Sequence, residues 1–239
     1  RELARQQAAR HASDPNADAC VVHLLDQKVF NLNPDYFSYT TSKLALERSV
    51  ALQAQALAPA VRVCGVAPGL IFPSGPQTDD NFDRASRVNL LRRAIDESRK
   101  ARAAGNHPFA CILVGPDGTV LMTQHNAYLP DHDMTGHAER VLMTRASTTL
   151  PKEVLKECTI YTSAEPCAMC AGAIYWTGLK RVVFGLTEKD LKAITGDHPE
   201  NPTLDLPCHV IFAAGQRQVE VIGPMLEAEA AAVHEGAWG

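Results

Sequence analysis

His137-Ala138-Glu139 and Pro166-Cys167-Ala168-Met169-Cys170 are the two stretches from which the fold of this chain can be predicted. Two cysteines three residues apart at the start of a helix present both sulfur atoms on one face, and the preceding proline favours a helix start. His137 adds a nitrogen from the start of another predicted helix. Two thiolates and an imidazole suit Zn²⁺. The pattern therefore predicts a zinc site that joins the starts of two helices.

The predicted site has three protein ligands, His137, Cys167 and Cys170. Structural zinc sites are closed by four protein ligands, whereas catalytic sites keep one position for water. Glu139 is placed to take a proton from that water and pass it on. Because residues i and i+2 of a regular helix point about 200° apart, we expect His137 to lie at the irregular start of its helix.

The alternative is a structural zinc site whose fourth ligand is Cys158, Cys208 or His125. A lone C-x-x-C motif would favour that alternative. The combination of H-A-E, the strand-like stretch at 159–165 (TIYTSAE) and P-C-x-x-C favours the catalytic site.

Helical and strand-like segments alternate around the predicted site. Two strands, 109–114 and 120–124, are joined by Gly-Pro-Asp-Gly, which is typical of a hairpin turn. The other predicted elements are helix 88–104, helix 138–147, strand 158–162, helix 167–177, strand 181–185, helix 187–194, a weak strand 208–213 and a C-terminal helix near 224–235. This order predicts a mixed sheet with helices on both faces.

Residues 86–239 resemble the cytidine and deoxycytidylate deaminase superfamily, in the branch of guanine deaminase and tRNA adenosine deaminase. The matching stretches are His107-Pro108-Phe109-Ala110, His125-Asn126, Gly136 to Arg140 and Tyr161 to Trp176. The pattern H-x-E followed by P-C-x-x-C is the signature of zinc-dependent nucleobase deaminases. The resemblance implies a three-layer α/β/α domain with a mixed sheet.

The resemblance also implies roles for individual residues. Zinc is held by His137, Cys167 and Cys170, and Glu139 is the proton shuttle. Asn126, eleven residues before the zinc histidine, binds the base, and the backbone of Ala138 and of residues 163–165 lines the same pocket.

The implied reaction is hydrolytic deamination of a nucleobase or nucleoside, with release of ammonia. Ala173-Ile174-Tyr175-Trp176 resembles guanine deaminases and favours guanine, although Tyr175 and Trp176 can equally serve to pack their helix against the sheet. Cytosine and adenosine are further candidates, and adenosine in tRNA is the rival substrate. A zinc-stabilised binding module, which would hold metal without turnover, is the alternative from another class.

The sequence of residues 1–80 predicts a strand at 19–25, a helix at 39–57 and a strand at 61–66. They resemble part of a short-chain dehydrogenase/reductase, closest to the pteridine reductases, which makes this segment a partial Rossmann-like fragment. Tyr39 and Lys43 form the Y-x-x-x-K motif, in which the ammonium group would lower the pKa of the phenol, and Asp26 matches the pteridine-reductase branch. Ala67-Pro68-Gly69-Leu70 matches the loop after the next strand.

The glycine-rich cofactor loop of such reductases is missing from the printed sequence, so the fragment is expected to be inactive and to bind no nicotinamide cofactor. The alternative function is an NADPH-dependent pteridine or carbonyl reductase, if other sequence completes the fragment. Residues 68–83 are rich in Pro, Gly and Asp and are expected to form a linker between the two segments.

Composition limits the remaining possibilities. The chain has 23 basic and 27 acidic residues, a formal charge of −4, so nucleic acid is disfavoured as a partner, with tRNA remaining possible. Its apolar runs are far shorter than the roughly 20 residues of a membrane helix. Seven cysteines without an export signal favour free thiols or metal ligands. We therefore expect a cytoplasmic protein, not bound to membranes, that acts on a small molecule as a homodimer; its initial Arg is consistent with a fragment.

Overall fold

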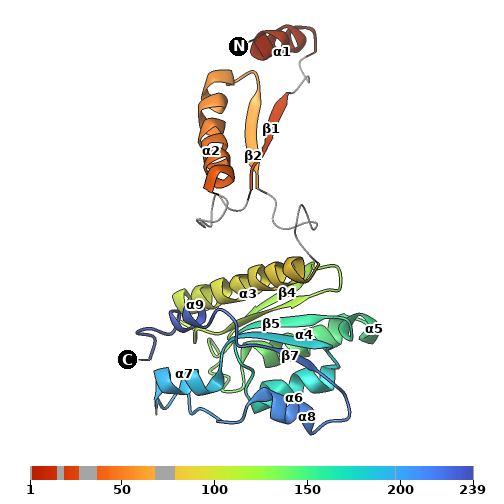
Figure 1. The fold of residues 1–239 in the computed structure, drawn as a ribbon, viewed down its shortest axis with the longest axis vertical. Helices are drawn as coiled ribbons and strands as arrows, with labels where there is room; N and C mark the ends of the chain where they lie inside the picture. The colour runs from red at the N-terminus through yellow and green to blue at the C-terminus, as the bar shows by residue number, and fades with distance from the viewer. Residues whose placement is uncertain (1, 15–18, 27–36, 68–78, 197, 239) are drawn as a thin grey trace. The chain divides into compact units, whose positions relative to one another are not determined.

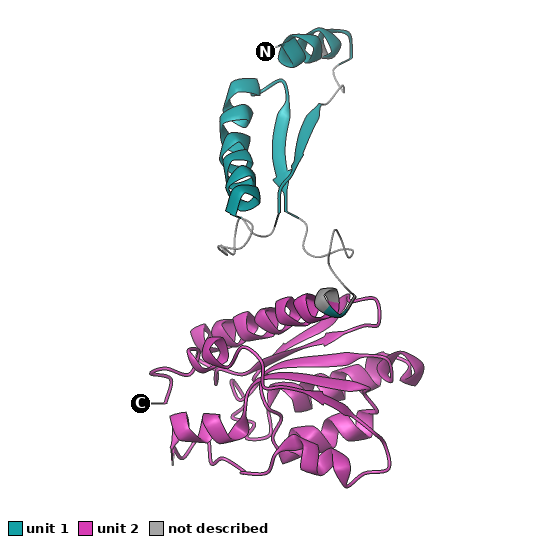
Figure 2. Ribbon diagram, viewed as in Figure 1, with its two compact units in different colours: residues 1–82 teal, residues 83–239 magenta. Residues whose placement is uncertain are grey.

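The computed structural model describes residues 2–14, 19–26, 37–67, 79–196 and 198–238. The chain divides into two compact units, residues 1–82 and 83–239 (Figure 2).

The first unit is built on a pair of parallel strands, β1 (Cys20–Leu24) and β2 (Arg62–Val66). Helix α2 (Phe37–Leu57) connects the two strands, and α1 (Glu2–Ser13) precedes them. The strand, helix and strand predicted here are present within two residues of their predicted bounds. Most of the linker predicted at 68–83 lies outside the described residues, but from Asp79 onward the chain is already helical.

The second unit is organised by a five-stranded mixed sheet in the order β4-β3-β5-β6-β7 (Figure 1). Strand β3 is antiparallel to both of its neighbours, β4 and β5, whereas β5, β6 and β7 run parallel. The strands are β3 (Ala110–Val114), β4 (Val120–His125), β5 (Thr159–Ala164), β6 (Arg181–Leu186) and β7 (Glu220–Ile222). The mixed sheet predicted from the sequence is confirmed.

Helices cover both faces of this sheet. Successive residues of a strand point to opposite faces, so each buried strand contributes side chains to both cores. Cys111 and Leu113 of β3 face a core formed with α4, α6 and α8, whereas Ile112 and Val114 face a core formed with α3, α7 and α9. Figure 1 shows α3 and α6 on opposite sides of the sheet. The helices are α3 (Asp79–Ala103), α4 (Ala138–Thr149), α5 (Lys152–Leu155), α6 (Ala168–Thr177), α7 (Glu188–Thr195), α8 (Cys208–Ala213) and α9 (Glu227–Ala231). The three-layer α/β/α architecture is therefore confirmed.

The weak strand predicted at 208–213 is wrong, because these residues form helix α8. Pro207 precedes the helix, and the backbone N–H of Cys208 donates to Glu165 Oε1 at 2.9 Å. Cys208 and Phe212, one turn apart, are the buried residues of α8. The fifth strand is β7 instead, and the C-terminal helix α9 is shorter than the predicted 224–235.

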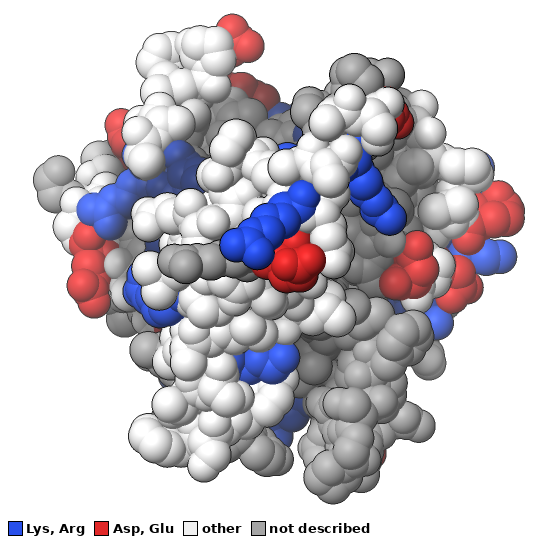
Figure 3. Space-filling model, turned by 90° about the horizontal axis from the view of Figure 1, so that it is seen from above, with Lys and Arg blue, Asp and Glu red and all other residues white. Residues whose placement is uncertain are grey.

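Charged side chains of both signs are interspersed on the face shown in Figure 3. On α3, Arg92 binds Glu229 through Nε and Nη2, and Arg99 pairs with Asp96. The described residues contain no helix long and apolar enough to cross a membrane.

The imidazole of His234 is buried near the C-terminus, against Phe109 and Trp238, whose indole N–H donates to His234 Nδ1 at 3.3 Å. Burial lowers the pKa of His234 to about 4, and the charge of Arg102 acts in the same direction. The unfolded chain takes up a proton here near its ordinary pKa of 6.5, so between pH 6.5 and about 4 it binds more protons than the folded chain. The stability that His234 contributes is present above pH 6.5 and is lost as the pH falls toward 4.

In wild type, the free energy of unfolding should fall between pH 6.5 and about 4 because of His234. We expect this fall to be smaller in His234→Phe. Urea denaturation at stepped pH measures this slope. His209→Phe, at an exposed position of α8, is the matched control and should keep the wild-type slope. An unchanged slope in His234→Phe would contradict the assignment.

Candidate active site

His137 lies immediately before helix α4, with extended backbone angles of φ −63° and ψ 141°. Glu139 is the second residue of the helix and is buried. The irregular start allows the imidazole and the carboxylate to face the same cavity, as expected from their spacing.

Gly136 permits a close approach of two backbone segments beside His137. Its carbonyl oxygen accepts a hydrogen bond from Ala127 N–H at 2.7 Å, and a Cβ at position 136 would lie 2.5 Å from the carbonyl oxygen of Ala127. A larger residue would therefore displace one of the two segments. The glycine holds the loop that begins at Asn126 against the start of α4.

Cys167 and Cys170 complete the cluster from the start of α6. Cys167 precedes the helix and Cys170 is buried in its first turn. Cys167 Sγ lies 3.5 Å from His137 Nδ1, and the three potential ligand atoms all lie within 4.8 Å of one another. Tetrahedral zinc, with a Zn–S bond of about 2.3 Å and a Zn–N bond of about 2.0 Å, would separate sulfur from nitrogen by about 3.6 Å. The donor set and its spacing are consistent with Zn²⁺.

Among the described residues, this cluster has three members. The three side chains considered as a fourth ligand have other surroundings. The Cys158 thiol donates to Val154 O at 3.2 Å, His125 Nε2 lies 2.7 Å from Glu97 Oε2, and Cys208 is buried in the core beneath α8. Three ligands leave one coordination position open, which is the arrangement of a catalytic site.

The local electrostatics favour a thiolate in this cluster. The hydrogen bond from the Cys170 thiol lowers the pKa of Cys167, and the hydrogen bond to His137 acts in the same direction. The same contact with Cys167 raises the pKa of His137. The cluster therefore places a thiolate and an imidazole side by side.

The carboxyl of Glu139 has a protein partner that sequence reasoning missed. Thr162 of β5 donates a hydrogen bond from Oγ1 to Glu139 Oε1. Burial raises the pKa of Glu139, and the bond from Thr162 opposes that shift. Thr162 is fully buried and lies on the same side of β5 as Ile160, but β5 (TIYTSA) carries several hydroxyl residues, so its sequence did not single out Thr162.

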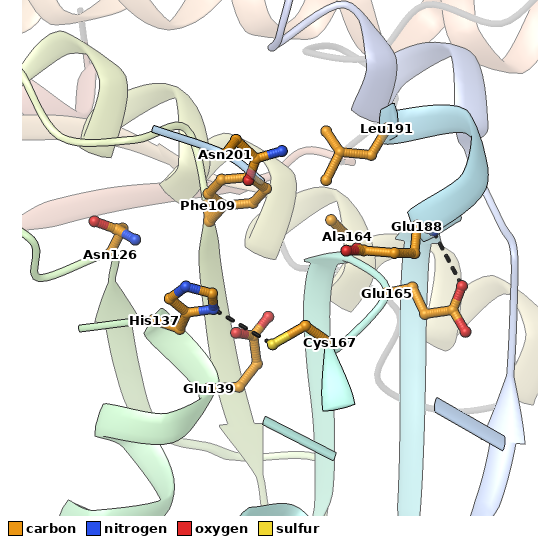
Figure 4. Close-up of a pocket in the computed structure, with 10 residues that line it drawn as sticks. All are labelled: Phe109, Asn126, His137, Glu139, Ala164, Glu165, Cys167, Glu188, Leu191 and Asn201. Atoms are coloured by element: carbon orange, nitrogen blue, oxygen red, sulfur yellow. Dashed lines mark hydrogen bonds between the residues drawn. The ribbon is translucent and has the colours of Figure 1, made fainter. Parts of the chain in front are cut away.

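A pocket opens onto this cluster. It is lined by Phe109, Asn126, His137, Glu139, Ala164, Glu165, Cys167, Glu188, Leu191 and Asn201 (Figure 4). The side-chain oxygen of Asn126 accepts a hydrogen bond from Tyr128 N–H at 3.0 Å. This bond turns the amide nitrogen of Asn126 toward the pocket, where no other described residue accepts from it (Figure 4).

Other residues predicted from the resemblance lie around the pocket rather than in it. Ala138 is fully buried and Ser163 accepts a hydrogen bond from Ala110 N–H, but neither lines the cavity. Tyr175 accepts a hydrogen bond from Gln216 N–H, and Trp176 is 79% exposed. Tyr175 and Trp176 therefore do not line the pocket. For Tyr175, this agrees with the alternative that the residue serves to pack its helix.

Ala164 and Glu165, from the stretch 163–165 expected to line the pocket by its backbone, are wall residues, but the carboxyl of Glu165 and the whole of Glu188 were not predicted. Glu165 accepts from the backbone N–H of Glu188 at 3.1 Å and from that of Cys208 at 2.9 Å, and so joins the starts of α7 and α8. Burial raises the pKa of Glu188 to about 8, and the charge of Cys167 adds to the shift. Both residues follow the carboxyl ends of the parallel strands β5 and β6, where ligands bind in α/β sheets; this rule could have found them.

In the first unit, the structure brings together the three predicted reductase residues. The Tyr39 hydroxyl donates to Asp26 Oδ2 at 2.8 Å, and Lys43 Nζ donates to Leu24 O at 3.0 Å. The hydrogen bond to Asp26 raises the pKa of Tyr39, rather than Lys43 lowering it as expected. A phenol with a raised pKa is a weaker acid.

Residues 85–186 match the model of the cytidine and deoxycytidylate deaminase zinc-binding region. The chain is 44% identical over 150 residues to a probable cytosine deaminase of Schizosaccharomyces pombe, which covers 62% of this chain and 90% of that protein. It is 36% identical over 102 residues to the guanine deaminase of Bacillus subtilis, covering 42% and 65%. The solved guanine deaminase of Nitrosomonas europaea superimposes with a TM-score of 0.52 at 25% identity, covering 62% of this chain and 82% of the other.

Proposed function

Because this chain belongs to the cytidine and deoxycytidylate deaminase family, we propose that its pocket deaminates a free nucleobase by hydrolysis. His137, Cys167 and Cys170 hold Zn²⁺ in this proposal, and Glu139 moves the protons. The observation that carries it is one pocket that combines a three-ligand zinc cluster, a buried carboxyl and an orienting amide.

The reaction adds water to a ring carbon, forms a C–O bond and releases ammonia as the C–N bond breaks. When bound, Zn²⁺ lowers the pKa of water at its open position toward ~7 and so supplies a nucleophile at neutral pH. Glu139 accepts the proton at a carboxylate oxygen and delivers it first to the ring nitrogen and then to the leaving amine. Thr162 holds the carboxyl in place, and Asn126 donates its amide N–H to the base.

Cytosine and guanine are the two candidate substrates, and a separate observation supports each. The 44% identity to the fission yeast protein, over 90% of its length, supports cytosine. The likeness to the Nitrosomonas europaea guanine deaminase supports guanine. The formal charge of −4 favours either base over adenosine in tRNA.

The test is ammonia release by the zinc-loaded full chain, with cytosine, guanine, adenine, their nucleosides and tRNA as substrates. We expect release from cytosine, guanine or both. Release from tRNA alone would replace the free base by the tRNA adenosine alternative. Stoichiometric zinc without release from any substrate would show a zinc-stabilised binding module.

Trp176 and Met169 of α6 are exposed apolar side chains of the deaminase unit. They support the proposal that the enzyme forms a homodimer, because large exposed apolar groups often mark an interface between subunits. Sedimentation equilibrium measures the mass, and a monomer at micromolar concentration would contradict this proposal.

Residues 1–80 are proposed to be a short-chain dehydrogenase-like fragment that takes no part in deamination, followed by the deaminase domain at 86–239. The parallel strand pair and the contact of Tyr39 with Asp26 support the likeness. The raised pKa of Tyr39 makes its phenol a poor proton donor for a reductase.

We expect Tyr39→Phe to leave kcat/KM for ammonia release unchanged, and the chain to show no saturable NADPH binding in a fluorescence titration. The physical reasons are that Tyr39 is not among the residues that line the deaminase pocket, and that the printed sequence lacks the glycine-rich loop that would hold the pyrophosphate. Saturable NADPH binding that Tyr39→Phe or Lys43→Met weakens would indicate a second active site.

A further inference from the structure

The carboxyl of Glu188 is a buried acidic group on the pocket wall. The residue is 7% exposed and is the first residue of α7, directly after the carboxyl end of β6. Its backbone N–H is bound by Glu165, but no described residue makes a hydrogen bond to its carboxyl oxygens. Figure 4 shows the carboxyl directed into the pocket, on the side opposite Asn126.

Such a group is costly unless something pairs with it. A buried carboxyl without a partner loses its hydration and regains no hydrogen bonds. Its neighbours on the wall include the apolar side chains of Ala164 and Leu191, which offer it no hydrogen bond. Buried polar groups that lack a protein partner and line a cavity are typical of ligand-binding positions.

We propose that Glu188 binds the substrate by accepting a hydrogen bond from a ring N–H, and that this contact makes the pocket specific for free bases over nucleosides. The proposal rests on the deaminase function proposed above. Asn126 presents an N–H donor from one side of the pocket and Glu188 an acceptor from the other. An amino-oxo base carries both a carbonyl oxygen and a ring N–H, so it satisfies both residues.

A nucleoside fails this requirement for a chemical reason. In cytidine and guanosine, the glycosidic bond replaces the ring N–H at N1 and N9, respectively. If Glu188 binds the N–H at that position, the sugar leaves its carboxyl unpaired. Sites built to bind a substrate N–H reject analogues that lack it by roughly 10⁴–10⁵-fold.

Glu165 acts through Glu188 as a positioning residue. Its two carboxylate oxygens accept from the backbone N–H groups at the starts of α7 and α8. This fixes the first turn of α7, and with it the direction of the Glu188 side chain.

The test compares Glu188→Gln with wild type on cytosine, cytidine, guanine and guanosine. Gln keeps the shape but replaces one carboxyl oxygen by an NH2 group that cannot accept, so we expect kcat/KM for the free base to fall by about 10–100-fold. The loss should lie mainly in KM, because the contact exists in both ground and transition states. The ratio of kcat/KM for base to that for nucleoside should fall as well. Zinc content and the thermal unfolding temperature should stay at wild-type values.

Two further variants separate recognition from structure. Glu188→Asp keeps the carboxyl on a shorter side chain and should recover part of the lost selectivity. Glu153→Gln, at an exposed position of α5, is the matched control and should behave as wild type. Should Glu188→Gln fold poorly, the ratio measured in Glu188→Asp decides the matter.

The outcomes distinguish this inference from the proposed function. A wild-type enzyme that deaminates bases and nucleosides equally well, or variants with an unchanged ratio, would overturn the role of Glu188 and leave the deaminase function intact. Zinc-loaded wild type that releases no ammonia from any substrate would overturn both.

Discussion

Glu139→Gln is expected to retain stoichiometric zinc and to lose ammonia release by roughly 10²–10⁴-fold, the usual contribution of a positioned acid–base group. Gln matches the shape of Glu and can still accept the hydrogen bond from Thr162, so the buried site should keep its geometry. The amide cannot carry a proton between water and the substrate nitrogen. The loss should therefore appear in kcat, which steady-state ammonia release measures.

Metal analysis of the same variant makes the result decisive. If Glu139→Gln loses zinc, Glu139 is a ligand and the assignment of three ligands is wrong. The exposed control Glu153→Gln should retain both zinc and activity. An active, zinc-replete Glu139→Gln would show that another group moves the proton.

Cys170→Ala is expected to release zinc and to destabilise the deaminase unit. Cys170 is fully buried in the first turn of α6, and its sulfur lies with Cys167 and His137, which precede α6 and α4. Zinc bound there joins the starts of both helices, so the free energy of zinc binding adds to the free energy of unfolding. Bound zinc raises the free energy of unfolding by about 4 kcal/mol when free zinc exceeds its Kd by a thousandfold.

Thermal unfolding with and without a chelator measures this difference. The chelator should lower the unfolding temperature of wild type and leave that of Cys170→Ala unchanged. Cys158→Ala and Cys208→Ala are the matched controls, since both thiols are buried but lie outside the cluster. Loss of metal from either control would indicate four protein ligands and a structural site.

The local parts of the site were predictable because short stretches of chain determine them. Cys167 and Cys170 are three residues apart, so one helical turn brings their sulfur atoms to the same face. The two-residue spacing of His137 and Glu139 already required an irregular helix start, which the backbone of His137 has. The continuous apolar run at 109–114 similarly predicted a strand, and the structure places a core on each side of it.

Errors arose where distant residues decide the structure. Residues 208–213 are too few for their apolar pattern to separate helix from strand, and Glu165, 43 positions earlier, accepts from the first N–H of the helix. The resemblance of Ala173 to Trp176 to guanine deaminases predicted a substrate preference, yet Trp176 points to solvent. The roles assigned to Asn126 and Ala138, and the fragment at 1–80, stay predictions.

The sequence by itself predicted the cluster of His137, Cys167 and Cys170, whose side chains the structure brings together, and the layered sheet, because short stretches of chain carry these patterns. The role of Glu139 as proton carrier stays a prediction. Only the tertiary structure placed Thr162 against Glu139 and Glu188 opposite Asn126. The order of the strands brings these residues together. In that order β3 pairs with β5 and β5 pairs with β6, and this arrangement buries both faces of the sheet. No single stretch of sequence encodes that burial, so the walls of the pocket become visible only when the chain is folded.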